Sequence, residues 1–179
     1  FITGTDRLLF FSQWMAYVVS VISSGLIARE MRVKKEIETI IKLFVATLPM
    51  AVMQASSTQI DMVVTILVVL GVYFSIMLLG KITIKRTILF GLVLGLGICT
   101  KATFYPFLII PLGITIFALT KNHFKNSLLI ILSILIIAIM PIRFMSQNFR
   151  LYENILGPFN TRGVTTLTNN ALDPTGFVS

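Results

Sequence analysis

Long apolar runs separated by short polar and basic connections dominate the chain. These runs lie near residues 8–28, 40–54, 62–80, 88–100, 102–120 and 127–144. An α-helix needs roughly 20 apolar residues to cross about 30 Å of hydrocarbon, and the alternating strand pattern of a membrane barrel is not seen. The pattern therefore predicts an all-α fold, a polytopic transmembrane helical bundle with about six membrane spans.

Two of the predicted spans are too short to cross a bilayer alone. The runs "IIKLFVATLPMAVM" and "ILFGLVLGLGICT" reach only about 20 Å at about 1.5 Å per residue. Lipid does not tolerate exposed backbone ends, so we expect neighbouring helices or a polar cavity to shield the outer ends of both. The polar segments "QASSTQID" and "TK" stand at those ends, which predicts a recess that faces outward.

Composition supports a membrane protein. The chain is 56% hydrophobic and only 12% charged, whereas a soluble domain carries about a quarter charged residues. The net charge of +8 does not indicate nucleic acid, because the basic residues form short clusters between apolar runs. The single cysteine, Cys99, lies in an apolar run and is expected to be an inert thiol.

The basic residues predict the topology. Ten of the 15 Lys and Arg residues lie in "AREMRVKKEIETIIK", "GKITIKR" and "TKNHFKNS", which the positive-inside rule places in the cytoplasm. The chain's N-terminus and residues 145–179 then lie outside. We expect a transmembrane bundle over residues 1–144 and an extracytoplasmic loop over residues 145–179. The first residue, Phe1, and the ending without a closing helix suggest an internal fragment with a truncated loop.

Asp61 and Lys101 are the two candidate site residues beside the short spans. Asp61 is either the N-cap of the helix after it or a functional carboxylate, because an ionisable group at membrane depth is costly. Lys101 either snorkels to the interface or holds an anionic head group. Together they form a plain ion pair or a site for an anionic substrate. A cation about 4 Å from a phosphate gains about 4 kcal/mol at an effective dielectric near 20.

Other polar residues carry less information. Arg143 and Arg150 belong either to an ordinary exposed loop or to a surface suited to bidentate phosphate contacts. His123 has no second ligand near it, so no metal site is predicted. Gly91 and Gly95 form a small-xxx-small pair, which is typical of close helix packing.

The sequence resembles the polytopic membrane glycosyltransferases of the GT-C class, especially the group of dolichyl-phosphate-mannose protein mannosyltransferases and aminoarabinose transferases. The likeness rests on "DRLLFFSQWMAYVVSVISSGLIAR", "LPMAVMQASSTQID", "GLVLGLGICTKATFYPFLIIPLG" and "FRLYENILGPFNT". Asp61 falls on the family's outer polar segment that ends in Asp, and Lys101 ends its "GL..G...TK" element. The family's main acidic motif lies upstream of these spans and is absent from this sequence.

This resemblance implies an integral, multi-pass protein of a bacterial or archaeal plasma membrane. It would transfer a sugar from a polyprenyl-phosphate donor to a lipid, glycan or protein acceptor on the outer face. Asp61 is the expected catalytic carboxylate, and Lys101, Arg143 and Arg150 are expected to bind the donor phosphate. The cofactor is left unknown. A transporter or flippase of lipid-linked sugars and a non-catalytic membrane scaffold remain the alternatives.

Overall fold

The computed structural model describes residues 7–57, 60–121 and 127–152. Within these ranges the chain is helical apart from short turns and contains no strand. The all-α prediction is therefore confirmed. The chain divides into two units, Phe1–Pro141 and Ile142–Ser179, which are described one at a time.

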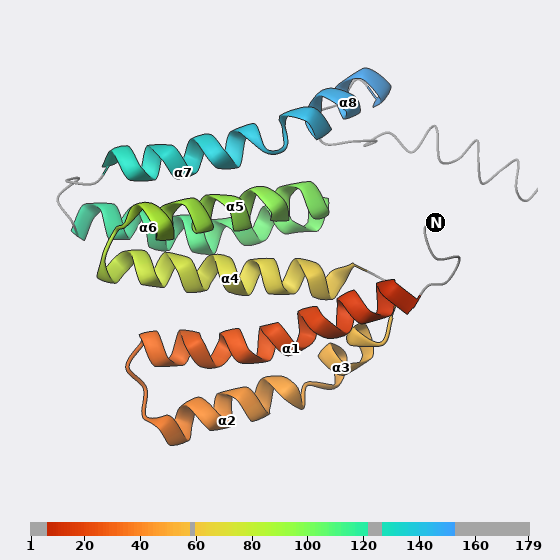
Figure 1. Ribbon diagram of the computed structural model, residues 1–179, viewed down its shortest axis with the longest axis vertical. Helices are drawn as coiled ribbons and strands as arrows, with labels where there is room; N and C mark the ends of the chain where they lie inside the picture. The colour runs from red at the N-terminus through yellow and green to blue at the C-terminus, as the bar shows by residue number, and fades with distance from the viewer. Residues whose placement is uncertain (1–6, 58–59, 122–126, 153–179) are drawn as a thin grey trace, which may run out of the picture. The chain divides into compact units, whose positions relative to one another are not determined.

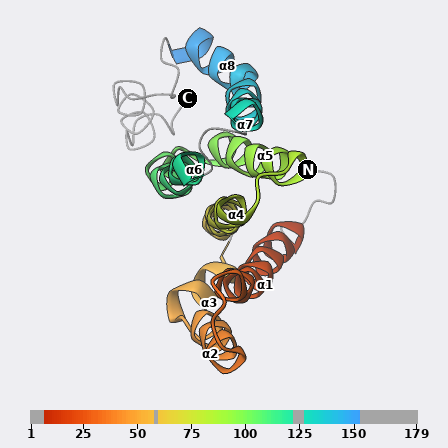
Figure 2. The same cartoon turned by 90° about the vertical axis from the view of Figure 1, so that its left-hand side faces the viewer.

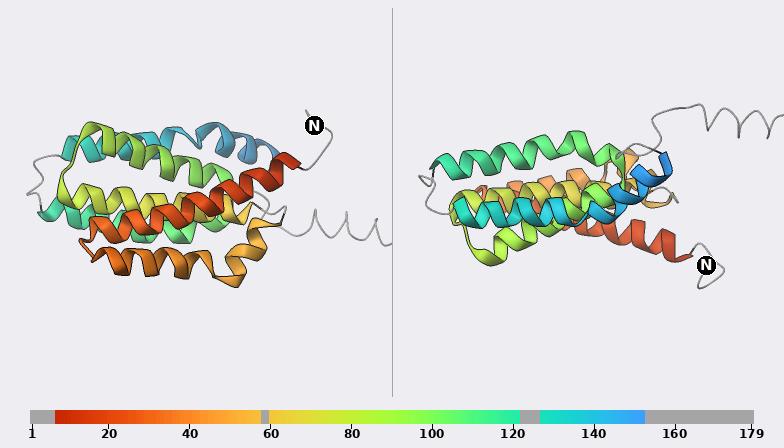
Figure 3. Two further views of the ribbon diagram at one scale, coloured as in Figure 1. Left: turned by 60° about the horizontal axis from the view of Figure 1, so that its bottom comes forward. Right: turned by 90° about the horizontal axis from the view of Figure 1, so that it is seen from above.

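The first unit is a bundle of roughly parallel and antiparallel helices. It contains α1 (Arg7–Glu30), α2 (Lys35–Ala46), α3 (Pro49–Ala55), α4 (Asp61–Gly80), α5 (Ile84–Thr100), the 3-10 helix η1 (Ala102–Leu108), α6 (Ile109–Lys121) and α7 (Ser127–Ile139). The chain runs back and forth between two ends, so that α1, α4 and α6 share one direction and α2, α5 and α7 the other (Figures 1 and 3). Helix α4 packs against α1, α5 and α6 and forms the centre of the bundle (Figure 2).

Four segments of the described residues are helices long and apolar enough to cross a membrane. They are Phe10–Glu30, Asp61–Gly80, Ala102–Thr120 and Ser127–Arg150. These correspond to the spans predicted at 8–28, 62–80, 102–120 and 127–144. The predicted spans 40–54 and 88–100 are not among them, so the structure does not confirm six spans.

The predicted span at 40–54 is broken in the middle. Helix α2 ends at Ala46, and Pro49 begins the separate short helix α3 after an extended Leu48. A proline has no N–H to continue the hydrogen-bond ladder, and its ring disfavours a helical residue before it. The structure therefore has two separate helices over 40–54 where the sequence predicted one continuous run.

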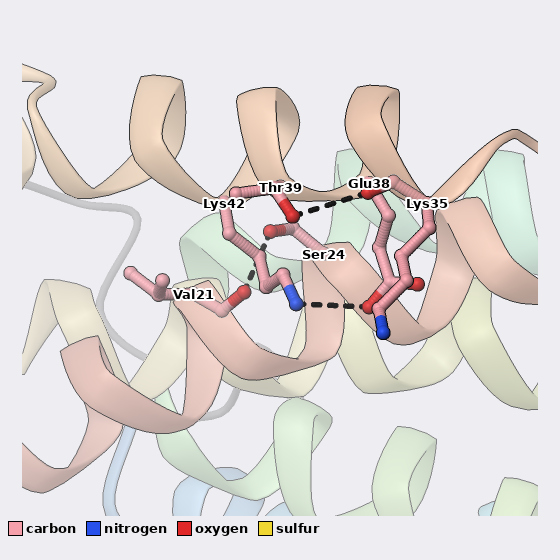
Figure 4. A network of polar contacts seen from close by, with 6 residues as sticks. All are labelled: Val21, Ser24, Lys35, Glu38, Thr39 and Lys42. Atoms are coloured by element: carbon pink, nitrogen blue, oxygen red, sulfur yellow. Dashed lines mark hydrogen bonds and ion pairs between the residues drawn. The ribbon is translucent and has the colours of Figure 1, made fainter.

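Helix α2 turns Lys42 and Glu38 toward α1 and exposes several apolar side chains on its other side (Figure 4). Lys42 donates to Glu38 at 2.9 Å and its stem crosses Gly25, where a Cβ would lie 2.6 Å from Lys42 Cδ (Figure 4). This hydrogen bond lowers the pKa of the Glu38 carboxyl. The opposite face is exposed and apolar, and it consists of Ile37, Ile40, Leu43 and Phe44. Such inverted polarity suits a helix whose outer face meets lipid rather than water.

Helix α5 is short but well covered by its neighbours. Two of its three glycines lie close to α7 or to the residue after it: a Cβ on Gly91 would lie 3.0 Å from the Ser133 carbonyl oxygen, and one on Gly95 would lie 2.6 Å from Met140 Sδ. Phe90 and Leu94 are almost fully buried. The expected shielding of a short span therefore holds for α5, and Gly91 and Gly95 serve packing as predicted.

The two ends of the bundle differ in charge. We call the end that carries the turns 31–34 and 81–83 the basic end, and the end that carries 47–57, Asp61 and Lys101 the polar end (Figure 1). At the basic end the Arg86 guanidinium donates to the carbonyl oxygens of Met77 and Lys81, at 2.8 and 3.1 Å, which completes the C-terminus of α4. The turns of two of the three predicted basic connections lie at this end, and most of the third, "TKNHFKNS", lies outside the described residues.

The second unit contains α8 (Ile142–Tyr152), which begins directly after Pro141. Residues 145–152 are thus helical at the start of the segment expected to be a loop. Residues 153–179, with the "ENILGPFNT" stretch, lie outside the described residues, as does His123.

Candidate functional site

Asp61 is the first residue of α4 at the polar end. The N-cap of the helix is Ile60, which makes no side-chain capping bond, so Asp61 is not the N-cap that one interpretation of the sequence required. A carboxylate in the first turn still lies favourably with respect to the helix dipole. The backbone carbonyl oxygen of Asp61 accepts a hydrogen bond of 2.8 Å from the Thr65 hydroxyl.

Lys101 follows α5 and pairs with Asp61. Lys101 has an extended backbone and is both the C-cap of α5 and the N-cap of η1. Its ammonium donates to Asp61 Oδ1 at 2.5 Å, and the two side chains are 41% and 27% exposed. The structure thus brings together two residues that are 40 positions apart in the sequence.

The position of Lys101 depends on a tight contact between α5 and η1. Gly97 lies directly against the ring of Phe104, which is 1% exposed, and the Phe104 N–H donates to the Lys101 carbonyl oxygen at 3.0 Å. A larger residue at 97 would overlap this ring. The absence of a side chain at Gly97 therefore lets the chain turn sharply and present Lys101 toward α4.

Another anion can replace Asp61 as the partner of Lys101, because both side chains of the ion pair are partly exposed. An exposed pair contributes only about 0–1 kcal/mol to stability. A ligand anion could therefore displace Asp61 from Lys101 at small cost. The geometry allows both a resting ion pair and an anion site.

A narrow apolar groove begins one turn from Asp61. It has a volume of about 130 Å³ and is lined by Val64, Thr65, Val68 and Val69 of α4 and by Phe107 of η1. Thr65 and Val68 follow Asp61 by four and seven residues, so they lie on the same face of α4. The ion pair thus stands at the polar end of a groove that runs along a candidate membrane span.

A larger groove lies between α1 and α3, also at the polar end. Its volume is about 570 Å³, and its lining is largely aromatic: Phe10, Phe11, Trp14, Tyr17, Val52, Ala55 and Ser56. Ala55 packs in one cluster with Ala16 and Met62, the residue after Asp61. This cluster connects the groove with the start of α4.

Sequence reasoning missed both grooves. Their residues are apolar and lie inside or beside apolar runs, where lipid contact or packing is the ordinary interpretation. The one available signal was the spacing of Phe10, Trp14 and Tyr17, which repeats by four and three residues and places three aromatic rings on one helix face.

Arg143 and Arg150 lie on α8, in the second unit, and both side chains are exposed. Their expected role in binding the same phosphate as Lys101 is therefore untested.

In the part of the chain that the structure describes, no group of His, Cys, Asp or Glu side chains could hold a metal ion. No protein-family model matches the chain, and neither curated proteins nor solved structures give a significant match.

Proposed function

We propose that the chain belongs to a membrane glycosyltransferase that takes a sugar from a polyprenyl-phosphate donor. The observation that carries the proposal is the exposed pair of Lys101 and Asp61 at the head of an apolar groove on α4. A lipid phosphate needs a cation for its head group and a lipid-accessible groove for the start of its chain. The acceptor would be a lipid, a glycan or a protein on the side of the polar end.

Lys101 would bind the donor phosphate. In the resting state its ammonium is held by Asp61 at 2.5 Å. The phosphodiester of the donor carries one negative charge, as the Asp61 carboxylate does, and would compete for this ammonium because an exposed ion pair is worth only about 0–1 kcal/mol. During transfer the bond between the sugar's anomeric carbon and the phosphate oxygen breaks, the electron pair stays on the phosphate, and Lys101 stabilises the charge that develops there.

Asp61 would act on the acceptor. Once the phosphate occupies Lys101, the carboxylate is released on the same face and can accept the proton of the attacking hydroxyl as the new bond to the anomeric carbon forms. Until a donor binds, the Lys101 ammonium would thus hold the Asp61 carboxylate in the ion pair.

The bundle offers less support for a transporter. Hydroxyl groups in the interior, those of Ser75, Thr87 and Ser133, each donate to a carbonyl oxygen of their own helix, at 2.7 to 2.9 Å. A transport route generally requires polar groups that face a ligand near the middle of the membrane.

Transfer from a radiolabelled polyprenyl-phosphate sugar, measured on the whole protein in vesicles, tests the proposal. We expect Asp61→Asn and Lys101→Ala each to lower the transfer rate by about tenfold or more, because each removes charge stabilisation or proton transfer. The matched control is Lys42→Ala, which removes the ion pair with Glu38 and should leave transfer nearly unchanged.

The charge-reversed double variant Asp61→Lys/Lys101→Asp separates catalysis from structure. It can restore an ion pair between α4 and the end of α5 but exchanges the positions of carboxylate and ammonium. We expect normal membrane insertion and little transfer. Near-normal transfer in this variant, or in both single variants, would show that the pair is only a structural contact of a scaffold.

A further inference from the structure

Helix α8 combines basic and apolar residues without any acidic one. Its sequence is "IRFMSQNFRLY", eleven residues in length, with Arg143 and Arg150 as its charged side chains. Both arginines are exposed. A short helix of this composition differs from the apolar helices α4 and α7, whose sequences contain almost no basic residues.

The two kinds of residue lie on different faces of α8. Arg143 and Arg150 are seven residues apart and thus share one face, with Gln147 between them. Ile142, Met145 and Phe149 follow one another by three and four residues and line an apolar hollow on a second face, together with Ser146. Ile142 and Phe149 are 57% and 58% exposed, so this apolar face is open.

Chain connectivity indicates what covers this face. Helix α7 and α8 up to Arg150 together form the candidate membrane span Ser127–Arg150, which is 24 residues long, and Pro141 interrupts the helix between them. At about 1.5 Å per residue this length is about 36 Å, more than the roughly 30 Å of hydrocarbon. The chain therefore leaves the hydrocarbon within α8, so that part of α8 lies at the level of the lipid head groups.

We propose that α8 is an interfacial helix that binds anionic phospholipids of the surrounding bilayer. Ile142, Met145 and Phe149 enter the boundary between head groups and acyl chains, to a depth of about 5–10 Å. Arg143 and Arg150 contact phospholipid phosphates, for which the planar guanidinium is well suited. This assignment replaces the donor phosphate as the ligand of the two arginines, and it matches their positive charge with the negative surface of an anionic bilayer.

Tryptophan quenching by brominated lipids tests the proposal on the whole chain. Trp14 is the only tryptophan, so a Trp14→Phe background allows one probe to be added at a chosen position. In vesicles with bromine near the head-group end of the acyl chain, we expect quenching in the Phe149→Trp variant about twofold stronger than in the Gln147→Trp variant. Gln147→Trp is the matched control, because it places the same probe on the arginine face.

Vesicles with brominated phosphatidylglycerol or brominated phosphatidylcholine test the lipid charge. In the Phe149→Trp variant we expect stronger quenching by the anionic lipid. Replacing Arg143 and Arg150 by glutamine should reduce the preference for phosphatidylglycerol over phosphatidylcholine by about fivefold for each arginine. This factor corresponds to about 1 kcal/mol for each basic side chain near an anionic surface.

Three results would overturn the proposal. Equal quenching of both probes, strongest with bromine at the chain terminus, would mean that α8 continues across the membrane. Absence of quenching in both would place α8 in water, and an unchanged lipid preference in the double glutamine variant would exclude phosphate binding by the arginines. Since Arg143 and Arg150 take no part in the proposed sugar transfer, these outcomes are independent of it.

Discussion

At the scale of single residues, a glycine controls the position of the candidate site lysine. Gly97 leaves space for the buried ring of Phe104, and Phe104 in turn donates its N–H to the carbonyl oxygen of Lys101. The charge of Lys101 and the missing side chain of Gly97 are thus parts of one local arrangement. Gly97, which has no side chain, therefore determines where the Lys101 ammonium lies.

We expect Gly97→Ala to lower the free energy of unfolding by about 1–3 kcal/mol, because the added methyl overlaps a ring that is packed on all sides. The measurement is thermal unfolding in detergent, followed by circular dichroism. Gly113→Ala on α6 is the control, since a Cβ there meets nothing within 4 Å. Removing a helical glycine at such an open position should be neutral or stabilise the helix by up to about 1 kcal/mol. Equal effects of the two substitutions would contradict this account.

At the scale of elements, the two short spans have different surroundings. Helix α5 packs against α4, α7 and η1 and buries about half of its residues, whereas α2 has no buried residue and packs mainly against α1. One bond between α1 and α2 joins the Tyr17 hydroxyl to the carbonyl oxygen of Ala46, at 2.5 Å, near the last turn of α2. Helix α2 is therefore expected to open more readily than α5.

Tyr17→Phe removes that hydrogen bond and should weaken the attachment of α2. A bond of about 1 kcal/mol corresponds to about fivefold faster amide exchange in residues 40–46. Hydrogen exchange read by mass spectrometry would show this change, while residues 84–100 should exchange as before. Tyr73→Phe on α4 serves as the control and should leave α2 unchanged. Faster exchange throughout the bundle would instead mean that the variant loses global stability.

At the scale of the whole molecule, charge distinguishes the two ends of the bundle. Arg32, Lys81 and Arg86 lie at the basic end, whereas Asp61 and Lys101 lie at the polar end. The positive-inside rule predicts that the basic end lies in the cytoplasm, and we therefore expect the candidate site to open on the outer side of the membrane.

Cysteine labelling tests this orientation. In a Cys99→Ala background, we expect an impermeant maleimide added to intact cells to label Ser56→Cys at the polar end. Gly80→Cys at the basic end should react only after the membrane is opened, because it faces the cytoplasm. The reverse pattern would show an inverted protein, and labelling of both from outside would contradict the bundle as a membrane-crossing unit.

The amino-acid sequence by itself determined the helical class and four apolar segments long enough to cross a membrane, but it also predicted two further spans that the structure does not confirm. These properties depend on local hydropathy and charge, which each segment carries independently of its neighbours. The sequence also placed Asp61 and Lys101 on one side of the predicted membrane and left open whether they form a pair.

Only the tertiary structure decided how the short segments behave and which residues meet. Pro49 separates α2 from α3, and α5 reaches its buried position through glycine contacts with a helix about 40 residues further along the chain. The bond between Lys101 and Asp61 and the grooves beside it join segments that are distant in sequence. Hydropathy reports how each residue interacts with solvent or lipid, but it carries no information about which distant residue will be its neighbour.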